Sequence, residues 1–191
     1  MNTLPNAILL IGPTGAGKTP LGEVAESRGL GEHPCRHFDF GAQLRALRQN
    51  PPASLSPDAQ AIIHEVLKQG RLLEPEESFV ACEIFQNWMQ DLCPETIIVL
   101  NGLPRTIAQA KELEAYLTVR LVLQLAADDA TILTRIHTNS GGDRTHREDD
   151  DAESIKKRLV AYRERTMPLL HHYEALGVPI LQRPIDCNTD P

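Results

Sequence analysis

The sequence has no excess of basic charge and no long apolar run. Its 191 residues carry a formal net charge of -7, whereas nonspecific binding to nucleic acid or to an anionic membrane requires a basic face. The apolar run at residues 7–11 is too short for a signal peptide or a membrane span, but it fits a buried strand. We therefore predict a cytoplasmic protein, expected to be a monomer, with no nucleic acid and no membrane among its partners. The charge still leaves room for a local basic cleft that binds a small phosphorylated ligand.

Closely spaced cysteines are also lacking. Cys35, Cys82, Cys93 and Cys187 are far apart and form no CxxC pair. Because a zinc knuckle or a redox dithiol needs neighbouring thiols, we predict no zinc and no thiol chemistry. Isolated buried thiols in a reducing compartment are the simpler interpretation.

The chain contains no internal repeats and no low-complexity linker, and its length predicts one α/β domain over residues 1–191. Strands alternate with helices, which implies a parallel sheet with helices on both faces. The predicted strands are residues 7–11, 36–40, 96–100, 119–125 and 178–181. The predicted helices are residues 17–28, 58–69 and 75–90, one from beyond Pro104 to about 117, one capped by Asp128 or Asp129, and 152–176 with Pro168 inside it. Phe79, Phe85 and Trp88 are expected in the core.

Four segments are expected to meet at one edge of this sheet. Ligands of parallel α/β sheets bind outside the carboxyl ends of the strands. The segments that reach this edge are residues 12–19, 40–45, 101–105 and the polar, glycine-rich loop 140–147. The ligand site is therefore predicted there.

Residues 12–19 read GPTGAGKT and match the pattern GxxxxGK[ST] between an apolar strand and a helix. Glycines let backbone N–H groups point at phosphate oxygens, and the helix N-terminus adds partial positive charge. Lys18 is predicted to reach the β- and γ-phosphates of ATP, and the Thr19 hydroxyl is a natural ligand for Mg²⁺. The predicted ATP-binding residues are Gly12, Pro13, Thr14, Gly15, Ala16, Gly17, Lys18 and Thr19. A chance glycine turn is the alternative, and the position between strand and helix argues against it.

The loop alone names no reaction, because its opening also resembles the start of tRNA prenyltransferases. Later segments of the sequence distinguish between the possible families. Residues 70–76 (GRLLEPE) resemble G-x-[LI]-V-P-D, and residues 101–106 (NGLPRT) resemble D-G-F-P-R-T. Residues 147–150 (REDD) and 156–159 (KKRL) resemble the lid pattern R-x-D-D…K-R-L. With residues 37–45 (HFDFGAQLR), which look like the segment that opens a monophosphate site, they make nearly the whole chain similar to the adenylate kinase family and its nucleoside monophosphate kinase relatives.

This resemblance implies a P-loop NTP-binding kinase fold, a three-layer α/β sandwich around a five-stranded parallel sheet. It implies a nucleoside monophosphate kinase that transfers the γ-phosphate of ATP, with AMP as the first candidate acceptor and Mg²⁺ as cofactor. Residues 40–75 would be the monophosphate-binding subregion, and residues 135–150 a short lid without a zinc cage.

The arginines suit this reaction, because phosphoryl transfer demands positioning and neutralisation of charge rather than covalent work by the protein. The resemblance assigns catalytic roles to Lys18, Arg105, Arg135, Arg147 and Arg158. It assigns monophosphate binding to Phe40, Arg45, Gly102, Arg105 and Gln109, with the glutamine reading the edge of the base. Taken alone, Arg45 or Arg158 is equally consistent with a solvated surface charge, and Gln109 with a surface residue.

Several positions depart from the family pattern. Pro20 stands where the family usually has threonine, and it removes a backbone N–H that would meet a phosphate. Ala42 and Asn101 replace two aspartates that usually hold the water shell of Mg²⁺. Asn139 falls near the position of a further lid arginine, which Arg144 is a candidate to replace.

These departures leave two hypotheses open. One is a working kinase, slow and dependent on unusually high Mg²⁺. The other is a catalytically weak or inactive nucleotide-binding module with a regulatory role. An alternative for the metal shell is that Asp39, beside Phe40, has replaced the lost carboxylates. Phe40 itself stands where relatives have a small hydroxyl residue near the base.

Overall fold

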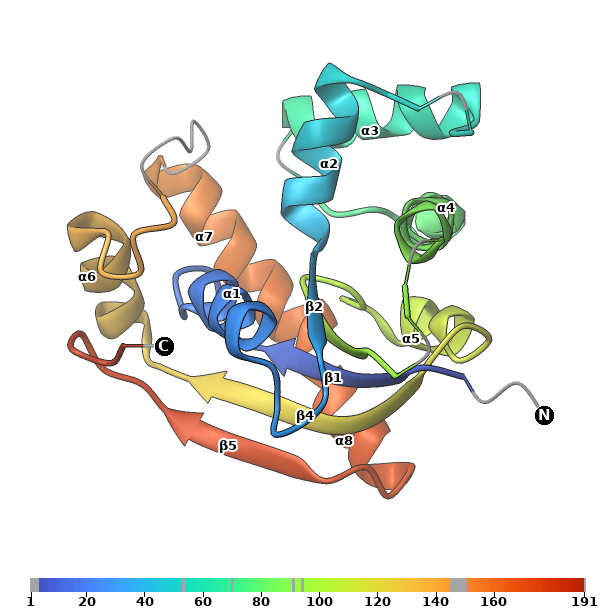
Figure 1. Cartoon of the computed structure of the whole chain (residues 1–191). Coiled ribbons are helices and arrows are strands. Elements are labelled where there is room, and N and C mark those ends of the chain that lie inside the picture. Colours follow the sequence, from blue (N-terminus) through green and yellow to red (C-terminus); the bar gives the residue numbers. More distant parts are fainter. Residues whose placement is uncertain are drawn as a thin grey trace.

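The computed structural model describes residues 4–52, 54–69, 71–90, 92–93, 95–144 and 151–190. Within these ranges a five-stranded sheet runs through the centre of the molecule (Figure 1). Its strands are β1 (Asn6–Ile11), β2 (Cys35–Asp39), β3 (Ile97–Asn101), β4 (Thr118–Ala126) and β5 (Ile180–Pro184). All pairings are parallel, and the strand order is β2-β3-β1-β4-β5. The predicted five-stranded parallel sheet is confirmed.

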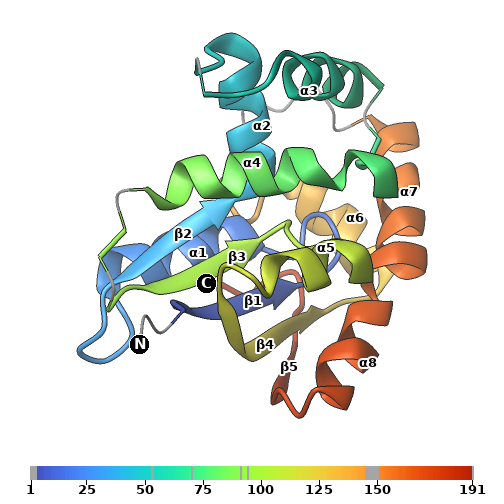
Figure 2. The ribbon, with the colours of Figure 1, turned by 90° about the vertical axis from the view of Figure 1, so that its right-hand side faces the viewer.

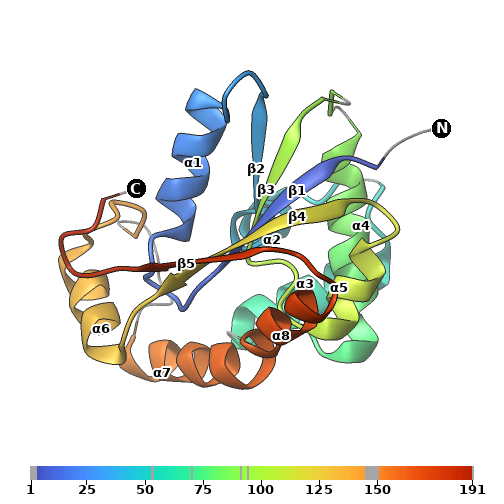
Figure 3. The same ribbon diagram turned by 90° about the horizontal axis from the view of Figure 1, so that it is seen from below.

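Helices cover both faces of the sheet, which gives the molecule three layers (Figure 3). The helical elements are α1 (Lys18–Arg28), α2 (Phe40–Gln49), α3 (Pro57–Gln69), the 3₁₀ turn η1 (Pro75–Glu77), α4 (Ser78–Met89), α5 (Ile107–Leu113), α6 (Asp129–Thr138), α7 (Ala152–Ala161), the π turn η2 (Tyr162–Thr166) and α8 (Pro168–Ala175). On one face α1 packs against the strands, and on the other α4, α5 and α8 enclose the larger core. No helix in the described ranges is long and apolar enough to cross a membrane.

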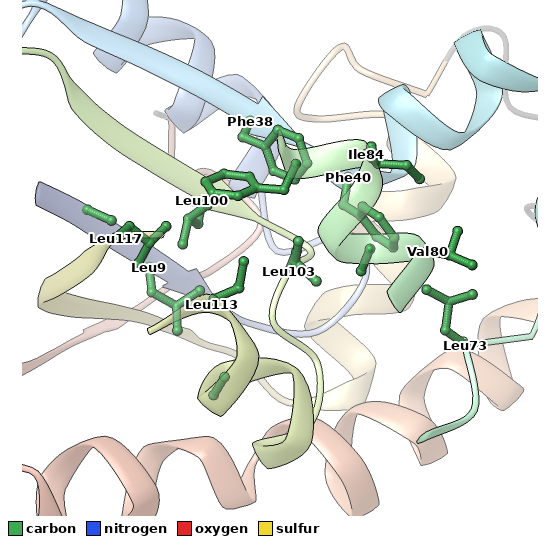
Figure 4. Close-up of a cluster of buried hydrophobic side chains, with 14 of the residues drawn as sticks. Leu9, Phe38, Phe40, Leu73, Val80, Ile84, Leu100, Leu103, Leu113 and Leu117 are labelled. Carbon is green, nitrogen blue, oxygen red and sulfur yellow. The ribbon is translucent and has the colours of Figure 1, made fainter. Parts of the chain in front are cut away.

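The core forms because the central strands carry apolar side chains on both faces. Successive side chains of a strand point to opposite faces, so Leu9 and Ile11 lie in the larger core while Leu10 packs on the side of α1. Phe38 of β2 is fully buried in this core (Figure 4). Its ring meets the Phe85 ring edge-on, with 5.1 Å between ring centroids. Replacing a buried phenylalanine by alanine typically costs about 3–5 kcal/mol. This packing therefore anchors β2 and the residues that follow it.

The end of β2 differs from the prediction. Phe40 was expected in the strand, but it is the first residue of α2. The reason is Asp39, whose Oδ1 accepts a hydrogen bond from the Ala42 backbone N–H at 2.8 Å and so caps the helix. Asp39 thus ends the strand and begins the helix.

Phe79 was also wrongly expected in the core. Phe79 is 40% exposed, whereas Phe85 is fully buried and Trp88 packs against the core. An α-helix turns by about 100° per residue, so positions 79 and 88 lie on opposite sides of α4. The three aromatic residues do not share one face.

The long C-terminal helix changes its turn before Pro168. Proline has no N–H, and its ring collides with the carbonyl four residues earlier in a regular helix. Before Pro168 the chain adopts the π turn η2, in which the Met167 N–H donates to the Tyr162 carbonyl at 2.8 Å. The helix predicted over residues 152–176 is therefore confirmed in extent, with one wider turn inside it.

α2 and α3 stand apart from the three layers, beyond the carboxyl end of β2 (Figures 1 and 2). α2 continues directly from β2, α3 packs against α2, and α4 lies between α3 and the sheet. This arrangement places the segment after Asp39 over the edge where the strands end.

Candidate active site

The loop between β1 and α1 has the backbone that phosphate binding requires. Gly15 and Gly17 have φ angles of 79° and 90°, left-handed values that residues with side chains rarely adopt. A Cβ atom on Gly15 would also lie 2.7 Å from Cγ1 of Ile136. The loop opens directly into α1, whose first turn carries no acidic residue. Its N–H groups and the helix dipole therefore favour an anion there.

Lys18 lies over this loop. Its Nζ donates hydrogen bonds to the backbone carbonyls of Gly12 at 2.7 Å and of Pro13 at 2.8 Å. These contacts keep the ammonium group beside the loop, within reach of a phosphate bound to the loop's N–H groups.

Three polar side chains from three elements meet at the carboxyl ends of β2 and β3. Asp39 and Asn101 are register partners at the last position of the two strands. Nδ2 of Asn101 donates to Oδ2 of Asp39 at 2.9 Å and to Oγ1 of Thr19 at 3.0 Å. Thr19 in turn donates its hydroxyl to the same Asp39 oxygen at 2.7 Å. The residue after the loop lysine is thus joined to the ends of two strands, and we call these three residues the Asp39 cluster.

Asp39 is held in its charged form. Burial alone would raise the pKa of this carboxyl, but the hydrogen bonds from Thr19 and from the Ala42 N–H outweigh it, and the nearby charge of Arg45 adds to their effect. The pKa of Asp39 is therefore below its ordinary value. A negative charge stands beside Thr19 at neutral pH.

Arg144 and Arg158 converge on the phosphate loop. Nη2 of Arg144 and Nη1 of Arg158 each donate to Oγ1 of Thr14 at 3.5 Å. Arg144 is buried, and its backbone N–H donates to Oδ1 of Asn139 at 3.1 Å. Asn139 ends α6 with a φ of 48°, so it shapes the turn that carries Arg144 to the loop. Two guanidinium groups concentrate positive charge where phosphates would bind.

Arg135 joins the phosphate loop to the segment after β5. Its side chain is buried, and Nε donates to the Gly15 carbonyl at 3.3 Å. Nη1 donates to the carbonyls of Asp186 at 2.5 Å and Thr189 at 3.0 Å. These bonds fix the loop, and the catalytic role expected for Arg135 stays a prediction.

Part of the predicted lid lies outside the described residues. Arg147 is among residues 145–150, which the structure does not describe, so its expected place near ATP stays a prediction. The described part of residues 135–150 comprises the last turns of α6 and the turn that ends at Arg144.

Arg105 is fixed in the loop that follows β3. Its Nε donates to the Gly102 carbonyl at 2.8 Å, and its backbone N–H donates to Oε1 of Gln109 at 2.8 Å. The Thr166 hydroxyl donates to the Arg105 carbonyl at 3.2 Å. Gly102 has a φ of 79°, and a Cβ there would lie 3.3 Å from Nη2 of Arg105. The guanidinium group thus packs against a backbone conformation that suits glycine.

A narrow pocket lies between α2, α5 and residues 71–73. Phe40, Leu44 and Leu73 form apolar walls, and Arg105 and Gln109 bring polar groups. Its volume is about 20 Å³, roughly the room that one water molecule needs. Figure 4 shows that the Phe40 and Leu73 side chains belong to the same buried cluster as the sheet residues. The pocket is therefore an extension of the core.

Gln109 has a fixed amide orientation. It is buried, and because the Arg105 N–H can donate only to an acceptor, Oε1 must face that group. The two N–H bonds of Nε2 are then the groups with which Gln109 can meet a ligand. Gln109 is no surface residue, which answers the alternative left open by the sequence.

Most of the predicted monophosphate residues are brought together. Phe40, Arg105 and Gln109 line one pocket, and a Cβ on Gly102 would lie 3.7 Å from Cβ of Phe40. Arg45 is on α2, on the other side of Gly41. Its Nη1 and Oδ1 of Asp39 both lie 3.3 Å from the place of a Cβ on Gly41, so Arg45 is nearer to the Asp39 cluster.

Asp39 and Arg144 are the two site residues that the sequence named only as substitutes for others. Asp39 was missed as a strand-end residue because the strand predicted over residues 36–40 placed it inside the strand, whereas β2 ends at Asp39. Asn101 follows the strand predicted over residues 96–100 and was therefore expected at the ligand edge. Arg144 has no comparable signal, because a lone arginine in a polar loop is usually a solvated charge.

Few side chains are available to hold a metal directly. No group of three or more His, Cys, Asp or Glu side chains placed to bind a metal occurs among the described residues. A divalent cation here would depend on nucleotide phosphates and water, as is usual for Mg²⁺.

Comparisons with known proteins agree with this geometry. The family model described as Adenylate kinase matches residues 10–178. A protein of Synechococcus sp. (strain CC9902) named Adenylate kinase is 31% identical over 93% of this chain and 89% of its own length. A protein of the same name from Parvibaculum lavamentivorans is 31% identical over 89% of this chain and 80% of its own. The chain therefore belongs to the adenylate kinase family.

Proposed function

We propose that the protein is a Mg²⁺-dependent kinase that transfers the γ-phosphate of ATP to a nucleoside monophosphate, with AMP as the first candidate acceptor. Membership of the adenylate kinase family makes the chain an ATP-dependent phosphotransferase that acts on nucleoside monophosphates, the reaction that was predicted from the sequence. The acceptor base, the metal and the roles of single residues are our inference.

One observation carries the proposal: the end of β3 and the loop after it link two sites. Asn101 bonds to Thr19 at the phosphate loop, and Arg105, four residues later, lines the pocket with Phe40 and Gln109. A donor phosphate at the loop and an acceptor phosphate at Arg105 would then be neighbours. Such alignment of two reactants is the main requirement of phosphoryl transfer.

The side chains divide between the two phosphates. Lys18, Arg144 and Arg158 lie at the loop and would neutralise charge on the donor. Arg105 and Arg45 would hold the acceptor, because a planar guanidinium can bind a phosphate with two parallel hydrogen bonds. The attacking atom is a phosphate oxygen of the acceptor, so no side chain has to act as nucleophile.

The residues present at the loop fit Mg²⁺. Thr19, Asp39 and Asn101 offer a hydroxyl, a carboxylate and an amide, and oxygen groups are the ligands and water acceptors that this cation prefers. When bound with ATP, the ion would neutralise charge on the β- and γ-phosphates. The Asp39 cluster would orient its waters.

The base would enter the pocket beside Gln109. As the pocket is narrow, we infer that α2 and α3 shift outward when a monophosphate binds. This assigns residues 40–75 to the monophosphate and leaves residues 135–150 as the proposed lid. The protein is further proposed to work as a cytoplasmic monomer whose partners are ATP and a nucleoside monophosphate.

A coupled assay of ADP formation over a panel of monophosphates tests the proposal. We expect ATP- and Mg²⁺-dependent turnover that is fastest with AMP. Size-exclusion chromatography with light scattering tests the monomer. Binding of ATP without turnover of any monophosphate would instead favour the regulatory nucleotide-binding module.

A further inference from the structure

The Asp39 cluster keeps one carboxylate at an edge where both aspartates of the family pattern are replaced. Two aspartates that usually hold the metal's water shell are replaced by Ala42 and Asn101, which bring no charge. The structure nevertheless places a carboxylate there, on the last residue of β2. Within the described ranges, Asp39 is the carboxylate that hydrogen-bonds to the residue following the loop lysine.

We propose that Asp39 supplies the carboxylate that orients the water shell of Mg²⁺ in this protein, and that Thr19 and Asn101 hold it in place. The inference rests on the proposed function, in which ATP binds with Mg²⁺ at the phosphate loop. It moves the charge from the last residue of β3 to the last residue of β2, the neighbouring strand in the sheet.

The register of the sheet explains why the charge can move. Asp39 and Asn101 face each other across parallel strands, so a carboxylate on either one projects into the same small volume next to Thr19. Asn101 Nδ2 lies 2.9 Å from Oδ2 of Asp39. An aspartate at 101 would put two negative groups in contact, which is unfavourable. Asparagine at 101 and aspartate at 39 are therefore a matched pair.

The two oxygens of Asp39 have separate tasks. Oδ1 caps α2 by accepting the Ala42 N–H, a task that asparagine performs about as well. Oδ2 accepts from Thr19 and Asn101, so both oxygens act as acceptors, as only a carboxylate allows. These bonds hold the carboxylate beside Thr19, where its negative charge suits a cation at the loop.

The location also suits both substrates. Thr19 immediately follows Lys18 at the loop, and Arg45, an acceptor-side residue, lies near Oδ1 of Asp39 across Gly41. The carboxylate therefore stands between the donor and acceptor sites. Without a cation it would repel the phosphates of both, and with a cation it would attract the complex.

The effect of the Asp39 charge on nucleotide binding thus changes from repulsion to attraction when the cation is added, which gives a test that does not depend on turnover. The variant Asp39→Asn keeps the cap and the size of the side chain and removes the charge. Its amide nitrogen takes the place of Oδ2, so the Asn101 amide has to turn over to accept from it. We would measure binding of a nonhydrolysable ATP analogue by calorimetry, once with Mg²⁺ and once with EDTA. With Mg²⁺ we expect binding to weaken by roughly 10- to 100-fold, the usual cost of losing an outer-shell partner. With EDTA we expect the variant to bind more tightly than the wild type.

A second variant tests whether the charge, rather than the residue, matters. The double variant Asp39→Asn with Asn101→Asp returns one carboxylate to the cluster from the neighbouring strand. We expect it to regain most of the Mg²⁺-dependent affinity for the ATP analogue. With the analogue bound, we also expect it to bind Mn²⁺ about as the wild type does, which electron paramagnetic resonance measures. Thermal unfolding of each variant checks the fold, and Asp39→Ser, which also caps a helix, replaces Asp39→Asn if that variant does not fold.

The outcomes separate this inference from the proposed function. If the wild type does not bind the ATP analogue at all, the proposed function fails. If the wild type binds in a Mg²⁺-dependent way and Asp39→Asn keeps the same dependence, or loses affinity equally with Mg²⁺ and EDTA, only the role of Asp39 is overturned.

Discussion

The proposed donor and acceptor sides of the site are built in different ways. The donor side is built around one stretch of eight residues, Gly12 to Thr19, whose glycines and helix start favour an anion, and Arg144 and Arg158 add charge to it. The acceptor pocket draws on α2, on the segment before α4 and on the loop before α5, so it exists only after distant parts of the chain have packed. A local motif tolerates change elsewhere, whereas an assembled pocket does not.

The two sides also differ in how much of the core they use. Phe40 and Leu73 line the acceptor pocket and belong to the core cluster. Changing such a residue alters binding and stability together, because large buried side chains contribute about 2–5 kcal/mol each. Lys18, in contrast, donates from Nζ to the backbone carbonyls of Gly12 and Pro13 in the loop. We therefore expect that donor-side function can be removed without loss of the fold, and this contrast can be tested.

The largest effect is expected on the donor side from Lys18→Ala. The ammonium group would stabilise charge on the moving phosphoryl group, and removing one such group typically lowers kcat by roughly 10²- to 10³-fold. Steady-state kinetics should show this loss while the thermal unfolding midpoint stays close to that of the wild type. Loss of the folded state would mean that the loop depends on the core after all.

On the acceptor side, Arg105→Ala should raise the KM for the monophosphate and leave the KM for ATP nearly unchanged. Hydrogen bonds to charged groups contribute about 1.5–3 kcal/mol, which corresponds to roughly 10- to 150-fold. The matched variant Arg105→Lys keeps the charge but loses the planar fork, so it should recover only part of the loss. Equal rises in both KM values would show that the two sites are not separate.

Arg144→Ala should weaken the donor side by about tenfold, the lower end expected for a charged hydrogen bond. The side chain reaches Thr14 of the loop, so the KM for ATP should rise and that for the monophosphate should not. Arg144→Lys serves as the control that keeps the charge. A rise in the KM for the monophosphate alone would place Arg144 on the acceptor side.

The smallest effect is expected from Gln109→Glu. The carboxylate can still accept the Arg105 N–H, but it no longer donates toward the base, so the KM for AMP should rise by roughly two- to tenfold, as for one neutral hydrogen bond. Gln109→Met also leaves the Arg105 N–H without its acceptor and should cost more. An unchanged KM in Gln109→Glu would mean that Nε2 does not face the base.

Particular elements show which parts of the fold could be predicted from the sequence and which could not. The run of apolar residues before Gly12 predicted β1, and β4 and α6 followed from equally local patterns, with Asp128 capping α6 by accepting the Thr131 N–H. Phe40 was misplaced because Asp39, the residue before it, accepts the capping hydrogen bond from the Ala42 N–H and so ends the strand. Phe79 was misplaced because helical spacing alone does not say which face of α4 meets the sheet.

The sequence by itself determined the phosphate loop, the parallel sheet and the family, because each rests on neighbouring residues or on the order of short segments. The tertiary structure decided which polar residues share a site. Asp39 and Thr19 are 20 positions apart, and Asn101 and Thr19 are 82 positions apart, so their contact depends on the register between β2 and β3. Register and helix packing are set by the whole core at once, so a local sequence pattern does not predict them.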